Sequence, residues 1–182
     1  MSRFPLDQRQ RVKLRTRGRW GVQAGLLAGI AVAAFFFVAD LVRGAPLSTP
    51  LFLSQALLQQ GSLSLESGGV IQTLTGLSLG GRLAAFTALH LAMFTTLGVF
   101  AAGMSNLFHV RWNARTGAAV GLVMGFSAWL AASKAGTAWL AGAQLTPEIV
   151  VGAGIVGGAV LGWHLRLCHM DAEETRKPHF RG

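Results

Sequence analysis

The side chain with the clearest chemical potential is His90, which lies well inside a long apolar stretch. A neutral imidazole there can ligate a haem iron or the magnesium of a bacteriochlorophyll. Histidines inside a membrane also form hydrogen bonds to neighbouring helices. We expect such a hydrogen bond and no cofactor. Binding of haem or bacteriochlorophyll through His90 remains the alternative.

Charged residues near the ends of apolar stretches form a second candidate group. Asp40 precedes Arg43 by three residues, a spacing that permits an ion pair on a helix. Lys134 lies at similar depth in another stretch and can pair with Asp40 across a bundle. Ionisable residues inside a membrane also mark ion pathways, but a relay is expected to carry carboxylates at mid-depth. Since residues 28–34 are all apolar or Gly, we predict a structural pair, with a small transporter or channel as the alternative.

Catalytic motifs are missing from the sequence. It contains no His-Glu-x-x-His, no Gly-x-Ser-x-Gly, no phosphate-binding loop and no pair of cysteines. The single cysteine, Cys168, cannot form an internal disulfide. These features point away from an enzyme and indicate no metal site.

The composition places these residues in a membrane. Apolar residues make up 52% of the 182 residues and charged residues 13%, against about 25% charged residues in a typical soluble domain. Four stretches approach the roughly 20 apolar residues that cross a hydrocarbon core. We predict an all-α polytopic membrane protein, a four-transmembrane-helix bundle. Its helices span 20–42, 83–108, 116–140 and 147–166, between a basic tail at 1–19 and a second tail at 167–182.

The connections between these helices carry their own signals. The loop at 43–82 is the only long one, and Thr49-Pro50 predicts an interfacial helix at about 50–60 within it, with Thr49 as its cap. The loops at 109–115 and 141–146 are short. Thr116 is the expected cap of the third helix, and Thr146-Pro147 the expected start of the fourth.

Basic residues predict the orientation. The two tails, the 109–115 loop and Arg166 at the end of the fourth helix lie on one side of a four-span protein and hold thirteen of the sixteen lysines and arginines. By the positive-inside rule this side is cytoplasmic, and we expect a multi-pass protein of a bacterial inner membrane. Anionic lipids, at about 1 kcal/mol per basic residue, suit the tail better than nucleic acid. The tail residues expected to contact lipid or a partner are Arg9, Arg11, Lys13, Arg15, Arg17 and Arg19.

Glycine recurs at four-residue spacing in three of the helices. Residues four apart share a helix face, and a row without side chains lets another backbone approach closely. Ala88, Ala92 and Thr96 form a weaker row in the second helix. We predict that these rows are helix-packing faces, in a bundle that is wider at its outer side. The glycines are Gly21, Gly25, Gly29, Gly117, Gly121, Gly125, Gly154, Gly158 and Gly162.

Two stretches are similar to a loose group of small uncharacterised bacterial membrane proteins. They are Phe-Phe-Val-Ala-Asp-Leu-Val-Arg-Gly-Ala-Pro-Leu-Ser-Thr-Pro-Leu, from Phe36 to Leu51, and Phe-Thr-Ala-Leu-His-Leu-Ala-Met-Phe, from Phe86 to Phe94. The resemblance implies four helices in a bacterial inner membrane and no transferable activity. It also implies that Asp40, Arg43, Pro46, Pro50 and His90 belong to a shared scaffold.

The function expected from this sequence is non-catalytic. We expect an accessory or scaffold subunit that packs against a larger membrane complex, such as a respiratory or photosynthetic one, because the glycine rows offer many close-contact faces and no reactive cluster competes with them.

Overall fold

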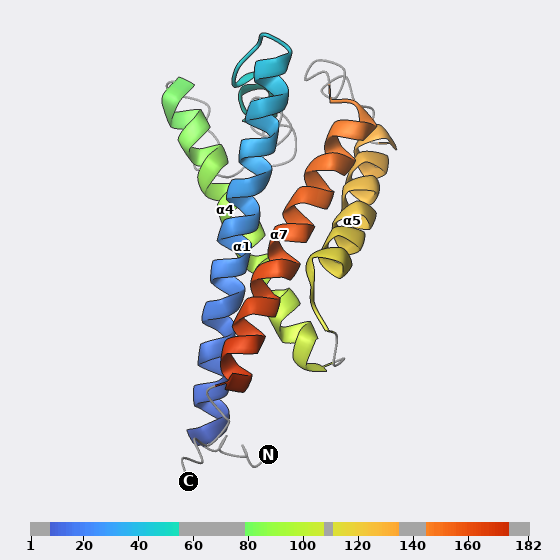
Figure 1. The fold of residues 1–182 in the computed structure, drawn as a ribbon. Helices are drawn as coiled ribbons and strands as arrows, with labels where there is room; N and C mark the ends of the chain where they lie inside the picture. The colour runs from blue at the N-terminus through green and yellow to red at the C-terminus, as the bar shows by residue number, and fades with distance from the viewer. Residues whose placement is uncertain (1–7, 55–78, 108–110, 135–144, 175–182) are drawn as a thin grey trace.

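The protein is built from four long helices. The structure, a computed structural model, describes residues 8–54, 79–107, 111–134 and 145–174. The helices are α1 (Gln8–Val42), α4 (Leu79–Leu107), α5 (Ala114–Lys134) and α7 (Pro147–Glu174) (Figure 1). A short helix at 48–54 follows α1, and the described residues contain no strand. The predicted all-α class is confirmed. Each long helix contains a segment long and apolar enough to cross a membrane: Gly18–Val42, Gly80–Ser105, Ala114–Ser133 and Pro147–Cys168.

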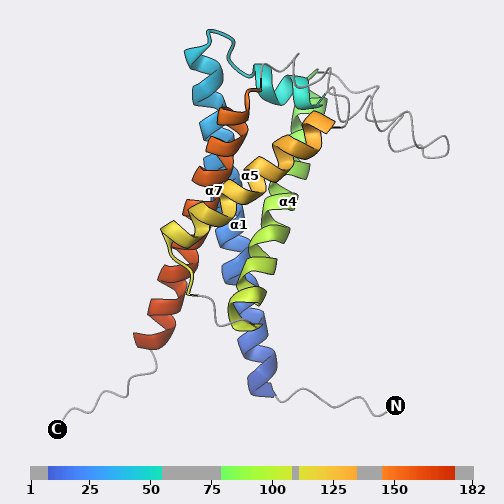
Figure 2. The same ribbon diagram turned by 90° about the vertical axis from the view of Figure 1, so that its right-hand side faces the viewer.

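The four helices pack as a row instead of a closed ring. The main interfaces join α4 to α1, α1 to α7, and α7 to α5. Helices α1 and α7 are therefore central, whereas α4 and α5 each have one main neighbour. Helix α1 begins and α7 ends at the same end of the molecule, which we call the terminal end; the other is the distal end (Figures 1 and 2). Helices α4 and α5 diverge towards the distal end, where the 48–54 helix lies.

Two helices are longer than the apolar pattern alone predicts. Helix α1 begins at Gln8, so much of the expected tail at 1–19 is helical, and α7 continues to Glu174 past the predicted end at 166. The α1 extension is rich in Arg and Gln, and the α7 extension contains Leu, Met, Ala and two Glu; all of these residues have high helix propensity. They also extend a helix already nucleated in the span, so each added residue gains a backbone hydrogen bond. Helix α4 begins at Leu79 instead of 83.

Helix α5 begins two residues before the expected position because Asn113, and not Thr116, is its cap. The Asn113 Oδ1 atom accepts a hydrogen bond from the Thr116 backbone N–H at 2.9 Å, and the Thr116 hydroxyl accepts one from the Asn113 N–H at 2.9 Å. This is a reciprocal capping box with Thr116 at its third helical position. Helix α5 is described to Lys134; the predicted remainder, 135–140, lies outside the described residues.

Helix α7 begins where the Thr-Pro-Glu pattern predicts. The Thr146 carbonyl accepts hydrogen bonds from the Ile149 N–H at 3.1 Å and the Val150 N–H at 3.3 Å. Pro147 occupies the first helical position, where its missing N–H costs nothing.

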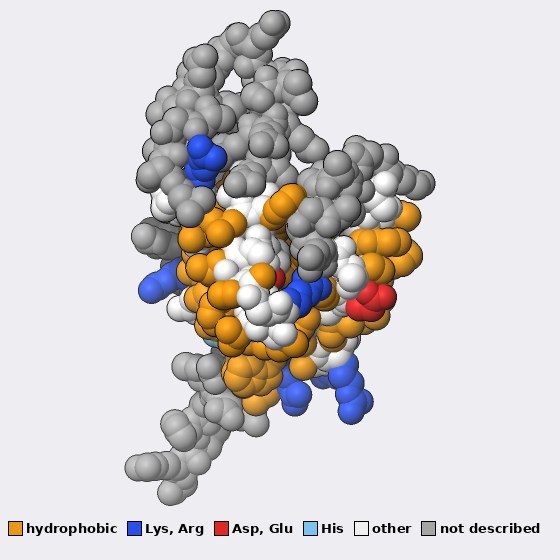
Figure 3. All heavy atoms as spheres, turned by 90° about the horizontal axis from the view of Figure 1, so that it is seen from above, with side chains coloured by type: hydrophobic (Ala, Val, Ile, Leu, Met, Phe, Trp, Pro, Cys, Tyr) orange, Lys and Arg blue, Asp and Glu red, His pale blue; other side chains and the backbone are white. Residues whose placement is uncertain are grey.

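Small side chains form most of the interior. Ala24 and Ala28 are completely buried, and Ala101, Ala102 and Ala153 nearly so. Large apolar side chains mostly point outwards, and seen from the distal end they dominate the described side-chain surface (Figure 3). This inverted arrangement suits a lipid environment, where helices associate by close contact between small residues instead of by hiding large ones.

Candidate functional site

Asp40 is the most deeply buried charged group that the structure describes. It lies in the last turn of α1 and has no exposed surface. Its carboxylate accepts two hydrogen bonds from Thr49: the backbone N–H donates to Oδ2 at 2.8 Å, and the hydroxyl donates to Oδ1 at 2.6 Å. Thr49 is itself only 1% exposed. We call this pair the Asp40–Thr49 clamp.

The backbone explains why this clamp forms. Helix α1 ends at Val42 and is followed by Gly44, whose φ of 71° is left-handed; the Gly44 N–H donates to the Leu41 carbonyl, and the Ala45 N–H to the Asp40 carbonyl. The chain reverses, and the 48–54 helix starts directly after Leu47. Leu47 offers no side-chain acceptor for the free N–H groups of the first turn. Asp40 supplies that acceptor from the preceding helix.

This geometry corrects two sequence predictions. Thr49 is not the cap of the short helix, because it lies inside the first turn and donates its hydroxyl to Asp40. The predicted ion pair between Asp40 and Arg43 is wrong: in the described part of the chain the carboxylate is bonded only to Thr49. The side chain of Lys134 lies outside the described residues, so its predicted pairing stays a prediction. So does the rest of the 50–60 helix beyond residue 54.

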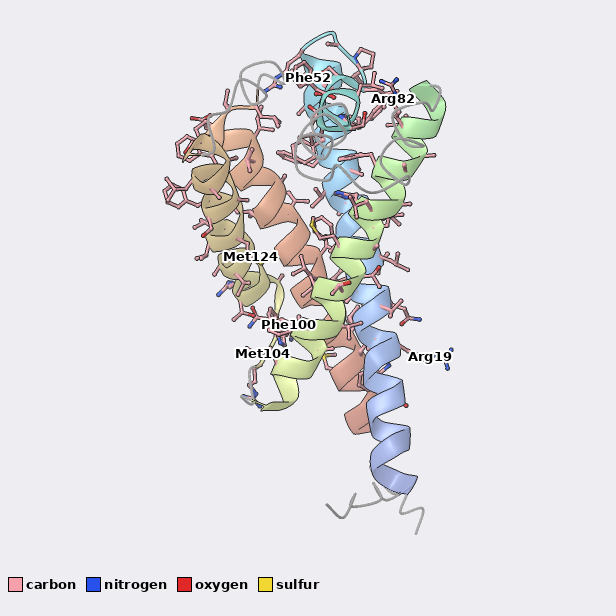
Figure 4. All side chains as sticks on the ribbon, turned by 180° about the vertical axis from the view of Figure 1, so that it is seen from behind. Arg19, Phe52, Arg82, Phe100, Met104 and Met124 are labelled. Atoms are coloured by element: carbon pink, nitrogen blue, oxygen red, sulfur yellow. The ribbon has the colours of Figure 1, made fainter. Side chains whose placement is uncertain are left out.

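An apolar cluster joins the short helix to α1, α5 and α7 at the distal end. Leu145, 8% exposed, is its buried centre. Phe52 lies at this end of the molecule (Figure 4). The clamp and the cluster together fasten the 48–54 helix over the region where the long helices diverge. The partly buried side chains around Leu145 are Phe36, Phe52, Leu53, Ala132, Ile149 and Val150.

His90 links α4 to α1. Its Nε2 atom lies 3.1 Å from the carbonyl oxygen of Gly29, so with the proton on Nε2 the ring donates a hydrogen bond across the helix interface. Phe94 lies against the ring, with centroids 4.8 Å apart, and Phe86 lies farther, at 6.1 Å. Gly29 has no side chain to block the imidazole. The expected interhelical hydrogen bond is therefore present in the geometry.

The glycine rows of α5 and α7 face one another. A Cβ atom added at Gly121 would lie 3.1 Å from the Gly158 Cα, and one added at Gly158 would lie 2.9 Å from the Gly121 Cα. Carbonyl oxygens of the opposite helix would be closer still. Real Cβ atoms do not approach backbone that closely, so only glycine permits this interface. The glycines in mutual contact are Gly117, Gly121, Gly125, Gly154, Gly158 and Gly162.

The glycines of α1 pack against α4, at residues that the sequence did not indicate. Gly21 and Gly25 face Gly98, where an added Cβ would lie 2.6 Å from the Gly25 backbone N. Gly29 lies against the side chain of Phe94. The predicted α4 row at Ala88, Ala92 and Thr96 is instead exposed. Gly98 was missed because it has no glycine partner four residues away on its own helix.

A second face of α7 packs against α1. Gly157 meets the side chain of Val32, and Gly152 meets the ring of Phe35. Helix α7 therefore carries glycine towards two neighbours at once, which lets it occupy the centre of the row. In the sequence, Gly157 and Gly158 are adjacent, and this adjacency is the signal that one helix serves two interfaces.

The loop between α4 and α5 inserts Trp112 among the helices at the terminal end. Its ring packs on a cluster that includes Ala24, Ala101 and Leu165. The indole Nε1 is buried and has no hydrogen-bond partner among the described residues. On helix α7, the Cys168 sulfur lies 3.6 Å from the His164 Nε2. These two residues are one turn apart on the helix.

These residues do not come together at one place. Among the described residues no three His, Cys, Asp or Glu side chains come together in a way that could hold a metal ion. Asp40, His90 and the His164–Cys168 pair lie on separate parts of the row. Of the basic tail, the side chain of Arg19 is described and exposed; those of Arg9, Arg11, Lys13, Arg15 and Arg17 are not described. No family model, curated protein or solved structure matches the chain.

Proposed function

We propose that this protein is a non-catalytic accessory or scaffold subunit of a larger assembly in a bacterial inner membrane. The observation that supports the proposal is that its buried and half-buried polar side chains form hydrogen bonds between helices. Asp40 holds the 48–54 helix through Thr49, and His90 holds α4 against α1 through Gly29. Both groups are engaged in fastening helices together.

The open row of helices supports the same proposal. Helices α4 and α5 each have one main neighbour, and both carry large exposed apolar side chains, such as Met93 and Phe100 on α4 and Met124 and Phe126 on α5. Figure 4 shows Phe100 and Met124 on these two outer helices. Such faces suit lipid and also offer room for a larger assembly on either side. In this proposal the terminal end is cytoplasmic, following the distribution of basic residues.

The two alternatives have weaker support. A transporter that uses Asp40 needs a carboxylate free to exchange ions or protons, and both of its oxygens accept hydrogen bonds from Thr49. A haem or bacteriochlorophyll carrier needs room around the imidazole, whereas the His90 ring contacts Phe94.

Native purification tests the proposal. A tagged chain, expressed at its natural level and extracted in two different mild detergents, is expected to co-migrate with the same membrane proteins in a fixed ratio, and without an absorption band above 350 nm. The matched control is Gly158→Ala, which is expected to weaken the chain's own fold and the co-migration together. A wild-type chain that migrates alone in both detergents refutes the subunit proposal. A Soret or Qy band that disappears in His90→Ala supports the cofactor alternative instead.

A further inference from the structure

One face of α1 is turned away from every other helix. We call it the α1 outer face; it comprises Arg19, Gln23, Ile30, Phe37 and Leu41, whose side chains are all exposed. Ile30 and Leu41 are each 56% exposed, and Phe37 is 45% exposed. Successive members are four or seven residues apart, so they share one side of the helix. Gly25, on the opposite side, meets α4.

Gln23 is the unusual member of this face. It lies four residues, or about 6 Å, farther into the span than Arg19. In the described part of the chain its amide forms no hydrogen bond. By contrast, Thr87, Thr95 and Thr96 in α4 each donate to the carbonyl four residues earlier on the same helix. Hydrocarbon offers no partner to an amide, and glutamine in a span commonly bonds to another helix.

Arg19 adds a charge at the edge of the same face. Its side chain projects away from the other helices (Figure 4), and α1 continues beyond it to Gln8 as an unbroken helix. This extension reaches about 15 Å past the start of the Gly18–Val42 segment. Its basic residues are Arg9, Arg11, Lys13, Arg15 and Arg17. A helix rich in basic residues, which we call the basic rod, thus continues α1 beyond the terminal-side end of the outer face.

We propose that the α1 outer face binds a transmembrane helix of another protein, one with a hydrogen-bonding side chain at the depth of Gln23 and acidic residues beyond its terminal-side end. This inference rests on the proposed subunit function and names the chemistry of the partner. The amide of Gln23 selects a polar residue within the span. Arg19 and the basic rod select acidic groups next to it.

The charge pattern favours such a partner over a second copy of this chain. Copies inserted in the same orientation place identical residues at the same depth. Two α1 outer faces in contact would bring Arg19 against Arg19 and one basic rod against the other. Like charges at that distance repel, whereas acidic groups there would attract.

A designed peptide in vesicles tests this inference directly. The probe is a 21-residue Leu/Ala transmembrane peptide with one Gln placed one turn inside its terminal-side end, followed by four Glu residues. The full chain and the peptide carry a donor and an acceptor dye in phosphatidylcholine vesicles, which have no net charge. Energy transfer is expected to saturate with increasing peptide. Replacing the peptide Gln with Leu, or its four Glu with Lys, is expected to weaken binding.

Variants of the chain assign the effect to the α1 outer face. Gln23→Leu is expected to weaken binding about threefold to tenfold, the range that interhelical hydrogen bonds give in membranes. Arg19→Gln is expected to weaken binding to the Glu peptide and leave binding to a Lys peptide no weaker. Thr96→Leu on α4 and Arg115→Gln on α5 are exposed matched controls and are expected to bind as the wild type. Circular dichroism checks that every variant keeps its helical content.

Four results would overturn the inference. Equal binding of the Glu and Lys peptides would show that charge attraction does not select the partner. Unchanged binding by Gln23→Leu would show that the Gln23 amide forms no hydrogen bond with the partner. Energy transfer between two differently labelled copies of the chain, lost in Gln23→Leu, identifies a second copy as the occupant. The double variant Gln23→Leu/Arg19→Gln is also compared with the native chain in co-purification. If both co-purify with the same complex equally well, the partner does not bind the α1 outer face, while the subunit function stands. A wild-type chain that migrates alone refutes the subunit function instead.

Discussion

The α5–α7 interface makes a quantitative prediction about Gly158. In Gly158→Ala the new Cβ would lie 2.9 Å from the Gly121 Cα and 3.0 Å from the Gly117 carbonyl carbon, and nearer still to the Gly117 oxygen. Ordinary contact begins at 3.4 Å. The two helices must therefore separate by about 0.5 Å or more, because the obstructing atoms are backbone and cannot rotate away.

The free-energy cost follows from that separation. A gap of about 0.5–1 Å forfeits a quarter to a half of each dispersion contact along the interface. Overpacking typically costs about 1–3 kcal/mol, and backbone on both sides places this site at the upper end. The higher helix propensity of Ala offsets about 1 kcal/mol. We expect a net loss of about 2 kcal/mol in the free energy of unfolding, or roughly a thirtyfold smaller ratio of folded to unfolded protein.

Reversible unfolding in mixed micelles measures this loss. Helical content is followed by circular dichroism as the fraction of denaturing detergent rises, and the midpoint for Gly158→Ala is expected at a lower fraction than for the wild type. The control is Gly103→Ala, the same substitution at an exposed position of α4. A Cβ atom added at Gly103 meets nothing within 4 Å. Equal midpoints for the two variants would show that the close contact between glycines does not stabilise the fold.

Three further substitutions probe the polar contacts by the same unfolding measurement. Asp40→Asn is expected to lose about 1–3 kcal/mol, because its amide nitrogen cannot accept the second hydrogen bond from Thr49; Thr49→Ser keeps both donors and is expected to lose less. His90→Phe is expected to lose about 0.6–1.7 kcal/mol with the bond to Gly29. Trp112→Phe is expected to unfold no more easily than the wild type, because it removes a buried N–H without a partner.

Each of these expectations can fail separately. Wild-type stability in Asp40→Asn would mean that the clamp carries no free energy. A loss in His90→Phe larger than in His90→Ala would indicate a steric effect instead of a lost hydrogen bond. A clear loss in Trp112→Phe would show that the packing of the indole ring on the cluster around Ala24 and Leu165 outweighs the cost of its buried N–H.

The local patterns of the chain were enough to identify the four helices and the start of α7. Runs of about 20 apolar residues must be helical in lipid, since every backbone N–H and C=O needs a partner within its own segment. Thr146 and Pro147 act on their own neighbours only, so their effect could be read without knowing the fold. The glycine rows of α5 and α7 likewise share a face by spacing alone.

Pairings between distant residues could not be predicted in the same way. Asp40 was assigned to Arg43 by proximity in the sequence, but the turn at Gly44 and the left-handed Leu47 bring Thr49 back to the carboxylate. The alanine row of α4 has the spacing of an interface, yet α1 approaches the side of α4 that carries Gly98.

The number of segments suited to the bilayer follows from the residues alone, because solvation of an apolar helix depends only on the residues in that segment. Which helix faces meet follows only from how the helices pack in three dimensions. Interior and exterior of a membrane protein are both apolar, so hydrophobicity cannot distinguish a packed face from one left to lipid. That choice depends on how closely whole helices fit, as Gly98 against Gly25 shows, and fit is a property of two surfaces together.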